Sequence, residues 1–258
     1  MLLKGKRILL TGGAGGIGRL VCQNLINEGA ELIVITQRNR LSFLARLVTA
    51  NLANSADLAR VCDIVAAEKP DILVNLAGIQ HFGKFEDESL SHIQNGFAVN
   101  LIAPVALAAA AIPHMRRRGS GQIVNMGSIM GSIGCANFVT YSSAKGGMHR
   151  FSEALRRELA GSGVQVTYIA PRAVATGMTT DGVRRYAKAT KMAIDEPVNV
   201  AAKIVTAIRH RRKEVYFGIP ESIFVRVNAI LPRVIDAAVA KSDRNAAHLI
   251  SPDLTSAT

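Results

Sequence analysis

A glycine-rich turn near the start of the chain constrains the fold more than any other feature. Residues 11–18 read Thr-Gly-Gly-Ala-Gly-Gly-Ile-Gly, directly after an apolar run at 8–10 and before a helical pattern at 19–27. Glycines in such a turn let backbone N–H groups and a helix N-terminus approach a pyrophosphate without obstruction by Cβ atoms. The segment therefore predicts a strand, a phosphate-binding turn and a helix in succession.

Apolar runs of strand length alternate with helical patterns along most of the chain. Unbroken runs of Val, Ile and Leu are typical of parallel strands that are covered on both faces. We expect one α/β domain with a doubly wound, Rossmann-like parallel sheet of about seven strands. The predicted strands are residues 7–11, 32–36, 46–48, 72–75, 123–126, 164–169 and 214–217.

The connection at 37–45 is unusually short. It has room for a turn but not for a crossover helix of about a dozen residues, so we expect a thinner layer on one face of the sheet there. The alternative is that the third strand lies elsewhere.

Composition limits the class of protein. With 258 residues, 49% of them hydrophobic, the chain is suited to one large core. The apolar stretch at 97–112 contains Asn100 and Pro104, so it predicts a buried helix and not a membrane span. The N-terminus has no secretory pattern. Three widely spaced cysteines in apolar contexts predict free thiols, no metal site and a cytoplasmic location.

The chain is basic, with a formal net charge of +12. Such a charge attracts anions, including phosphorylated cofactors, acyl thioesters and lipid head groups. Aromatic residues make up only 5% and tryptophan is absent, so surfaces for stacking on bases are scarce. We therefore do not expect nucleic acid as a partner.

A second motif lies at residues 141–145, which read Tyr-Ser-Ser-Ala-Lys. Positions four apart share one helical face, so the Tyr141 phenol and the Lys145 ammonium are expected side by side. A free tyrosine has a pKa of about 10, and a nearby positive charge lowers it. A proton donor beside a cation, together with a pyrophosphate-binding turn, is typical of a dehydrogenase.

These motifs and four further ones carry a resemblance to a known family. Over residues 4–220 the chain resembles the single-domain branch of the short-chain dehydrogenase/reductase family. The markers occur in the family's order: TGGAGGIG at 11–18, NLAG at 75–78, Asn100, Ser128, YSSAK at 141–145, and Pro171 followed by Thr176.

The resemblance implies a catalytic role for four residues. Tyr141 is expected to be the general acid, or the base in the reverse direction, with Lys145 lowering its pKa and binding the nicotinamide ribose. Ser128 is expected to orient the substrate carbonyl, and Asn100 to hold a water in a proton relay.

The resemblance also implies the cofactor contacts. Asn51 and Leu52 stand where the family often has an aspartate against adenine, so that contact is expected to differ here. The full set of expected cofactor-binding residues is Gly12, Gly15, Gly16, Ile17, Gly18, Thr36, Arg38, Asn51, Leu52, Asn75, Ala77, Gly78, Tyr141, Lys145, Pro171 and Thr176.

The end of the second strand favours NADP(H) over NAD(H). NAD enzymes place an acid there for the ribose 2′-hydroxyl, whereas this chain reads Ile35-Thr36-Gln37-Arg38. Thr36 and Arg38 can hold a 2′-phosphate. Against this, NADP-preferring relatives often carry a basic residue where this chain has Gly15. The alternative is that Arg38 is a solvated charge at the strand end.

Two features depart from the family pattern or extend it. Arg172 replaces the glycine that usually follows Pro171, and we expect it to point to solvent, the alternative being the substrate mouth. Residues 179–197 are expected to cover the substrate. Their basic residues suit an anionic substrate such as an acyl carrier thioester, or form an ordinary solvated face: Arg184, Arg185, Lys188 and Lys191.

The C-terminal segment predicts a basic amphipathic helix kinked at Pro232. The helix and tail at 221–258 follow a catalytic domain at 1–220, and we expect them either to belong to that domain or to form a peripheral appendage. Residues 221–242 either contact the inner face of a membrane peripherally, cap the pocket or meet a partner. We expect a homodimer through helices at 97–112 and 141–160.

Together these features predict an NADP-preferring oxidoreductase of the EC 1.1.1.- type. It would move hydride between the nicotinamide and a carbonyl or alcohol carbon of a small hydrophobic substrate, such as a ketone, a 3-oxoacyl compound or a lipid-like molecule. The alternatives are a catalytically silent protein that senses NADP(H), and an epimerase or dehydratase on the same scaffold.

Overall fold

The computed structural model describes residues 2–37 and 45–246. Its strands are β1 (Arg7–Thr11), β2 (Glu31–Thr36), β3 (Arg46–Thr49), β4 (Ile72–Asn75), β5 (Gly121–Met126), β6 (Val164–Ala170), β7 (Ala173–Val174), β8 (Ile194–Asp195) and β9 (Glu214–Tyr216). Its helices are α1 (Gly16–Asn27), α2 (Ser55–Glu68), α3 (Leu90–Phe97), α4 (Ala103–Arg118), α5 (Val139–Glu158), α6 (Asp181–Ala189), α7 (Pro197–Arg209), α8 (Ile219–Ile230) and α9 (Pro232–Ala246).

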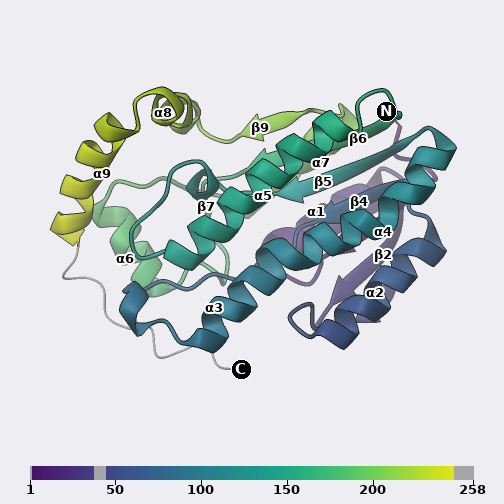
Figure 1. The fold of residues 1–258 in the computed structure, drawn as a ribbon, viewed down its shortest axis with the longest axis horizontal. Coiled ribbons are helices and arrows are strands. Elements are labelled where there is room, and N and C mark those ends of the chain that lie inside the picture. Colours follow the sequence, from purple (N-terminus) through teal and green to yellow (C-terminus); the bar gives the residue numbers. More distant parts are fainter. Residues whose placement is uncertain (1, 38–44, 247–258) are drawn as a thin grey trace.

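Seven parallel strands form the main sheet, in the order β3-β2-β1-β4-β5-β6-β9 (Figure 1). The predicted doubly wound sheet is confirmed, and the ends of the seven strands differ from the predicted ones by two residues at most. The strand order reverses between β1 and β4. Ligands of such sheets bind in the crevice at this reversal, outside the carboxyl ends of the strands.

Apolar side chains alternate between the two faces of the sheet. On β1, Ile8 and Leu10 join the core layer formed with α1 and α7, whereas Leu9 joins the layer formed with α2, α4 and α5. In Figure 1, α2, α4 and α5 lie in front of the sheet. Both faces are thus buried, which is why the strands read as unbroken apolar runs.

The predicted buried helix at 97–112 is part of a longer helical stretch. Residues Leu90–Arg118 are long and apolar enough to cross a membrane. However, the side chains of Leu107, Ala111 and Met115 lie in the core against the sheet. The stretch therefore belongs to the core of the fold.

The third strand is confirmed as β3, because it pairs in register with β2 from Ile33↔Arg46 to Thr36↔Thr49. The predicted thin layer at 37–45 and the predicted contact of Arg38 fall largely on residues 38–44. These lie outside the described residues.

A small second sheet was not predicted. β7 follows directly after β6 and pairs in parallel with β8, with α6 between them in the chain. The predicted cover at 179–197 thus consists of α6 and β8.

The C-terminal segment differs from its prediction. Two helices, α8 and α9, replace the single kinked helix, and Leu231 between them is non-helical with φ −130° and ψ 62°. A proline disfavours the helical conformation of the residue before it, so Pro232 ends α8 instead of bending it. The predicted boundary at 220 falls in the first turn of α8, and the two-part division stays a prediction. In Figure 1, α8 and α9 lie at one end of the molecule, beyond β9.

Candidate active site

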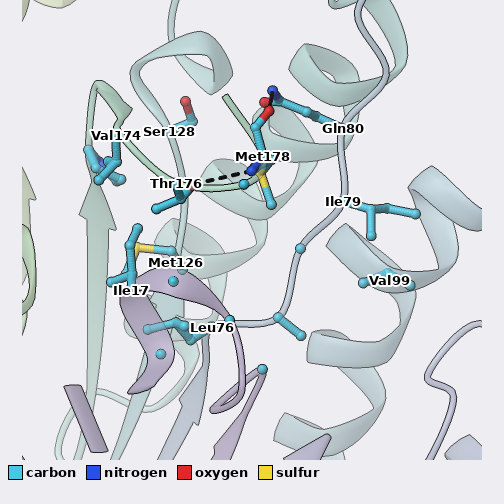
Figure 2. A pocket seen from close by; sticks show the side chains of 18 of the residues that line it. Ile17, Leu76, Ile79, Gln80, Val99, Met126, Ser128, Val174, Thr176 and Met178 are labelled. Carbon is cyan, nitrogen blue, oxygen red and sulfur yellow. Dashed lines mark hydrogen bonds between the residues drawn. The ribbon is translucent and has the colours of Figure 1, made fainter. Parts of the chain in front are cut away.

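A cavity of about 650 Å³ lies at the carboxyl ends of the central strands, beneath the cover. Figure 2 shows it from close by, with Ile17 on the glycine turn, Ser128 after β5 and Thr176 after β7 around the same space. The cavity brings together most of the predicted site residues: Gly12, Gly15, Gly16, Ile17, Gly18, Thr36, Leu52, Ala77, Gly78, Ser128, Tyr141, Lys145, Pro171 and Thr176.

Two predicted cofactor residues lie outside the described lining of this cavity. The Asn51 Oδ1 accepts hydrogen bonds from Gln37 Nε2, at 2.8 Å, and from the backbone of Ala53. Asn75 is buried, and its Nδ2 donates to Asn125 Oδ1 at 2.9 Å. Both side chains therefore form hydrogen bonds with neighbouring residues of the protein. A direct contact of Asn51 or Asn75 with the cofactor stays a prediction.

The glycine turn fits a dinucleotide pyrophosphate. Gly12 has φ +77°, and a Cβ there would lie 2.7 Å from the Ala77 Cα. A Cβ at Gly18 would lie 2.1 Å from the Gly12 carbonyl oxygen. Gly15 caps α1, and no described side chain bonds to the free N–H groups of the cap or adds a negative charge in the first turn. These N–H groups and the helix dipole are thus available to an anion.

Ser128 and Tyr141 meet inside the cavity. Ser128 follows β5, Tyr141 lies in the first turn of α5, and the Ser128 side chain is close enough to the phenol to lower its pKa. The Met130 N–H donates to Ser128 Oγ at 3.2 Å, and the buried Tyr168 hydroxyl donates to the Ser128 carbonyl oxygen at 3.4 Å. Ser128 is therefore held in position through both its side chain and its backbone.

Lys145 lies one helical turn beyond Tyr141. Its Nζ donates to the Met126 carbonyl oxygen at 2.9 Å and stands 5.6 Å from the centroid of the Tyr141 ring. Burial lowers the pKa of Lys145 to about 8. Burial also raises the pKa of Tyr141 to about 12, against the opposing effect of the Ser128 hydrogen bond. The expectation that the pKa of Tyr141 is lowered is therefore wrong for this structure, because desolvation disfavours the phenolate.

Asn100 lies in a π-helical turn, Ala98–Ile102, between α3 and α4. Its Nδ2 donates to the carbonyl oxygens of Gly96, at 2.9 Å, and Ile79, at 2.7 Å, and its Oδ1 accepts from the Ile79 N–H. A Cβ on Gly78 would lie 2.9 Å from Asn100 Oδ1 and 3.6 Å from Lys145 Nζ. Asn100 therefore holds the loop after β4 against the lysine. π-turns of this kind are frequent at functional sites.

A second cavity, of about 490 Å³, adjoins the first and shares part of its lining. Asn100 lines it, together with residues of the loop after β4 and of the cover. Tyr141 and Met178 line both cavities. The phenol thus stands between the predicted cofactor side and a space of suitable size for a substrate.

Sequence reasoning missed several residues that line the first cavity. Gln80 Nε2 donates to the Met178 carbonyl oxygen at 2.6 Å, which joins the loop after β4 to the cover (Figure 2). Loop residues carry no periodicity that would have identified them. Other missed lining residues are Ala14, Arg19, Gln37, Met126, Met130, Phe138 and Val183.

Arg172 does not point to solvent, contrary to the prediction. Its Nε donates to Asp195 of β8 at 3.1 Å, and its NH1 donates to Glu221 of α8 at 3.1 Å. The Arg172 side chain is 22% exposed, and the hydrogen bonds that it donates to Asp195 and Glu221 raise the pKa of its guanidinium. The residue that replaces a family glycine thus links the cavity wall, the cover and the C-terminal helices.

The basic residues of the cover face outward. Val183 and Tyr186 of α6 are buried beneath it, with ring and aliphatic contacts to Phe82 and Phe138. The structure therefore favours the solvated-face alternative. The exposed cations are Arg184, Arg185, Lys188 and Lys191.

The three cysteines are free, as predicted. Cys22, on α1, is buried in the core, whereas Cys62 and Cys135 are partly exposed.

Comparisons with known proteins agree with this geometry. A family model described as short chain dehydrogenase matches residues 6–187. Ketoacyl reductase HetN of Nostoc sp. (strain PCC 7120) is 34% identical over 257 residues, covering 91% of this chain and 88% of that protein. 3-Oxoacyl-(acyl-carrier-protein) reductase FabG of Salmonella typhimurium is 32% identical over 192 residues, covering 69% of this chain and 78% of that protein.

Among solved structures, a short chain dehydrogenase from Burkholderia cenocepacia J2315 in complex with NADP has the same fold. Its TM-score is 0.79 at 21% identity, and the match covers 93% of this chain and 99% of that one. The family model, the relatives and the arrangement of Ser128, Tyr141 and Lys145 lead to one conclusion: the chain belongs to the short-chain dehydrogenase/reductase family, and it is an NAD(P)-dependent oxidoreductase.

Proposed function

We propose that the protein is an NADPH-dependent carbonyl reductase that acts on 3-oxoacyl or similarly hydrophobic ketone substrates. The observation that carries this proposal is the position of Tyr141, which lines both cavities and lies beside Ser128 in the first. When bound, NADPH supplies the hydride. Tyr141 donates the proton to the carbonyl oxygen, and Ser128 orients that oxygen toward the phenol.

The protonation state of Tyr141 fits it to act as the acid in carbonyl reduction. A pKa of about 12 keeps the phenol protonated at neutral pH, which suits a general acid. The Lys145 ammonium stabilises the negative charge that develops on the phenol as the proton leaves. Both groups are therefore in the protonation state that carbonyl reduction requires.

The substrate class rests on the cover and on two relatives. The inward side of α6 is apolar, with Val183 packed against the second cavity, so it suits an acyl chain. The names of HetN and FabG both refer to reductases of ketoacyl or 3-oxoacyl substrates. Neither observation determines the length of the substrate's acyl chain or the group that carries it.

The preference for NADPH rests on the end of β2. Thr36 and Gln37 line the first cavity at the position where an acid would bind the ribose 2′-hydroxyl. Arg19, an exposed cation, also lines the cavity. A cavity whose described lining has a guanidinium and no carboxylate favours a 2′-phosphate.

The test is a titration of the purified protein with NADPH and with NADH, followed by nicotinamide fluorescence, together with turnover of 3-oxoacyl thioesters. We expect tighter binding of NADPH. Replacing Thr36 with aspartate should weaken NADPH binding at least about tenfold by charge repulsion and leave NADH binding intact. Tighter binding of NADH by the unchanged protein would contradict the preference.

The same experiment addresses the alternatives. NADPH binding without turnover over a broad panel of carbonyl compounds would identify the silent sensor. Nicotinamide that stays bound through turnover would identify an epimerase or dehydratase. The homodimer through α4 and α5 stays a prediction.

A further inference from the structure

Helix α8 turns apolar side chains to the outside, whereas an ordinary surface helix turns them to the core. Two of its polar residues face the protein: Glu221 binds Arg172, and Asn228 Nδ2 donates to the Ser132 carbonyl oxygen at 2.9 Å. All its residues are described, and none of them is buried. Ile219 and Ile230 are 79% and 78% exposed. A surface helix normally turns its apolar stripe to the core.

We call the exposed apolar side chains of α8 and of the start of α9 the outer face. Ile219, Ile223 and Ile230 recur at spacings of four and seven, which places them on one side of α8. Exposed side chains at the junction with α9 continue the set. The outer face consists of Ile219, Ile223, Phe224, Ile230, Leu231 and Val234.

The charges around the outer face are mostly positive. Arg226 lies on the same side of α8 as the three isoleucines, and Arg233 and Arg244 are exposed on α9. The acids are mostly turned inward: Glu221 pairs with Arg172, and Asp243 accepts a hydrogen bond from Tyr186. Among the described side chains of the two helices, Asp236 is the one exposed acid.

We propose that the outer face binds the surface of a bilayer containing anionic phospholipids. Interfacial helices combine an apolar face, which enters the boundary between head groups and acyl chains, with arginines that contact the lipid phosphates. A second copy of this chain fits less well, because a symmetric contact would bring two positively charged faces together. The proposal is independent of the substrate and of the cofactor preference.

The test is sedimentation of the full-length protein with vesicles of phosphatidylcholine, with and without phosphatidylglycerol. We expect binding to the anionic vesicles, weakened by high salt, and little binding to phosphatidylcholine alone. Replacing Ile219 and Ile230 together with serine should lower the partition at least about tenfold, because two exposed isoleucines lose their apolar contact. Replacing Arg226 or Arg233 with glutamine should lower it about fivefold each.

The control is Val198→Ser on α7, which removes a similarly exposed apolar side chain elsewhere, 63% exposed. It should leave the partition unchanged, and circular dichroism and NADPH binding should show that every variant is folded. Absence of binding to anionic vesicles would overturn the proposal, as would binding that the isoleucine substitutions leave intact. A wild-type oligomer that dissociates in the isoleucine variant, without any vesicle binding, would assign the outer face to a second copy instead.

Discussion

The ammonium of Lys145 stands 5.6 Å from the centroid of the Tyr141 ring, and burial shifts the pKa values of the two groups in opposite directions. In water, both side chains titrate near pH 10. In the site, the pKa of Lys145 is about 8 and that of Tyr141 about 12. The lysine therefore loses its proton first, while the phenol is still protonated.

This order of titration predicts the pH dependence of carbonyl reduction. Below pH about 8 Lys145 is charged and kcat/KM should be maximal; above it the ammonium is lost and kcat/KM should fall. In Lys145→Arg the positive charge persists at alkaline pH, so the residual kcat/KM of this variant should not fall above pH about 8. The measurement is a pH profile of kcat/KM for both proteins. The same fall of kcat/KM at alkaline pH in the variant would contradict the attribution of that fall to Lys145.

Tyr141→Phe removes the proton donor without removing the ring. We expect kcat to fall about 10²–10⁴-fold, with NADPH affinity nearly unchanged. Tyr216→Phe is the matched control, because its hydroxyl bonds to His149 at 3.1 Å outside the described linings of both cavities. Steady-state kinetics and a fluorescence titration on the two variants distinguish catalysis from binding. Near-normal turnover by Tyr141→Phe would refute its role.

Arg172→Ala should destabilise the fold by about 2 kcal/mol, because Asp195 and Glu221 lose a shared, largely buried charged partner. Arg150→Ala is the control: the Arg150 side chain, paired with Glu153, is 77% exposed, so its loss should cost less than about 0.5 kcal/mol. Urea unfolding measures both values. An equally small decrease in the free energy of unfolding for Arg172→Ala and Arg150→Ala would show that the link between the cover and α8 adds nothing to stability.

Gln80→Ala removes the hydrogen bond from the loop after β4 to the Met178 carbonyl in the cover. One such bond contributes about 1 kcal/mol net, so KM for the carbonyl substrate should rise about fivefold if the bond keeps the cover closed. Gln23→Ala is the control, because Gln23 donates to Asn27 on the exposed side of α1. An unchanged KM in Gln80→Ala would mean that the cover closes without this bond.

Local patterns were sufficient to predict the sheet and the positions of the main site residues. The apolar run before Thr11 and the glycines after it specify a strand, a turn and a helix within one short segment. Tyr141 and Lys145 share a helical face by spacing alone. These features depend on neighbours in the chain, so the sequence exposes them directly.

Features that depend on distant partners could not be predicted. The two carboxylates that bind Arg172 lie 23 and 49 positions further along the chain. The pKa of Tyr141 depends on how deeply the phenol is buried. The sequence shows only that Lys145, which would lower this pKa, lies four positions away. For residues 221–242 the pattern predicted an amphipathic helix, but periodicity does not say which side faces the protein.

The way α8 is attached has a consequence for its thermodynamics. The polar contacts through Glu221 and Asn228 replace the usual apolar contact area. Detaching α8 would therefore expose little additional nonpolar surface and would add little to the heat capacity of unfolding. Its docking should respond to ionic strength more than to temperature, unlike the docking of α1 or α7.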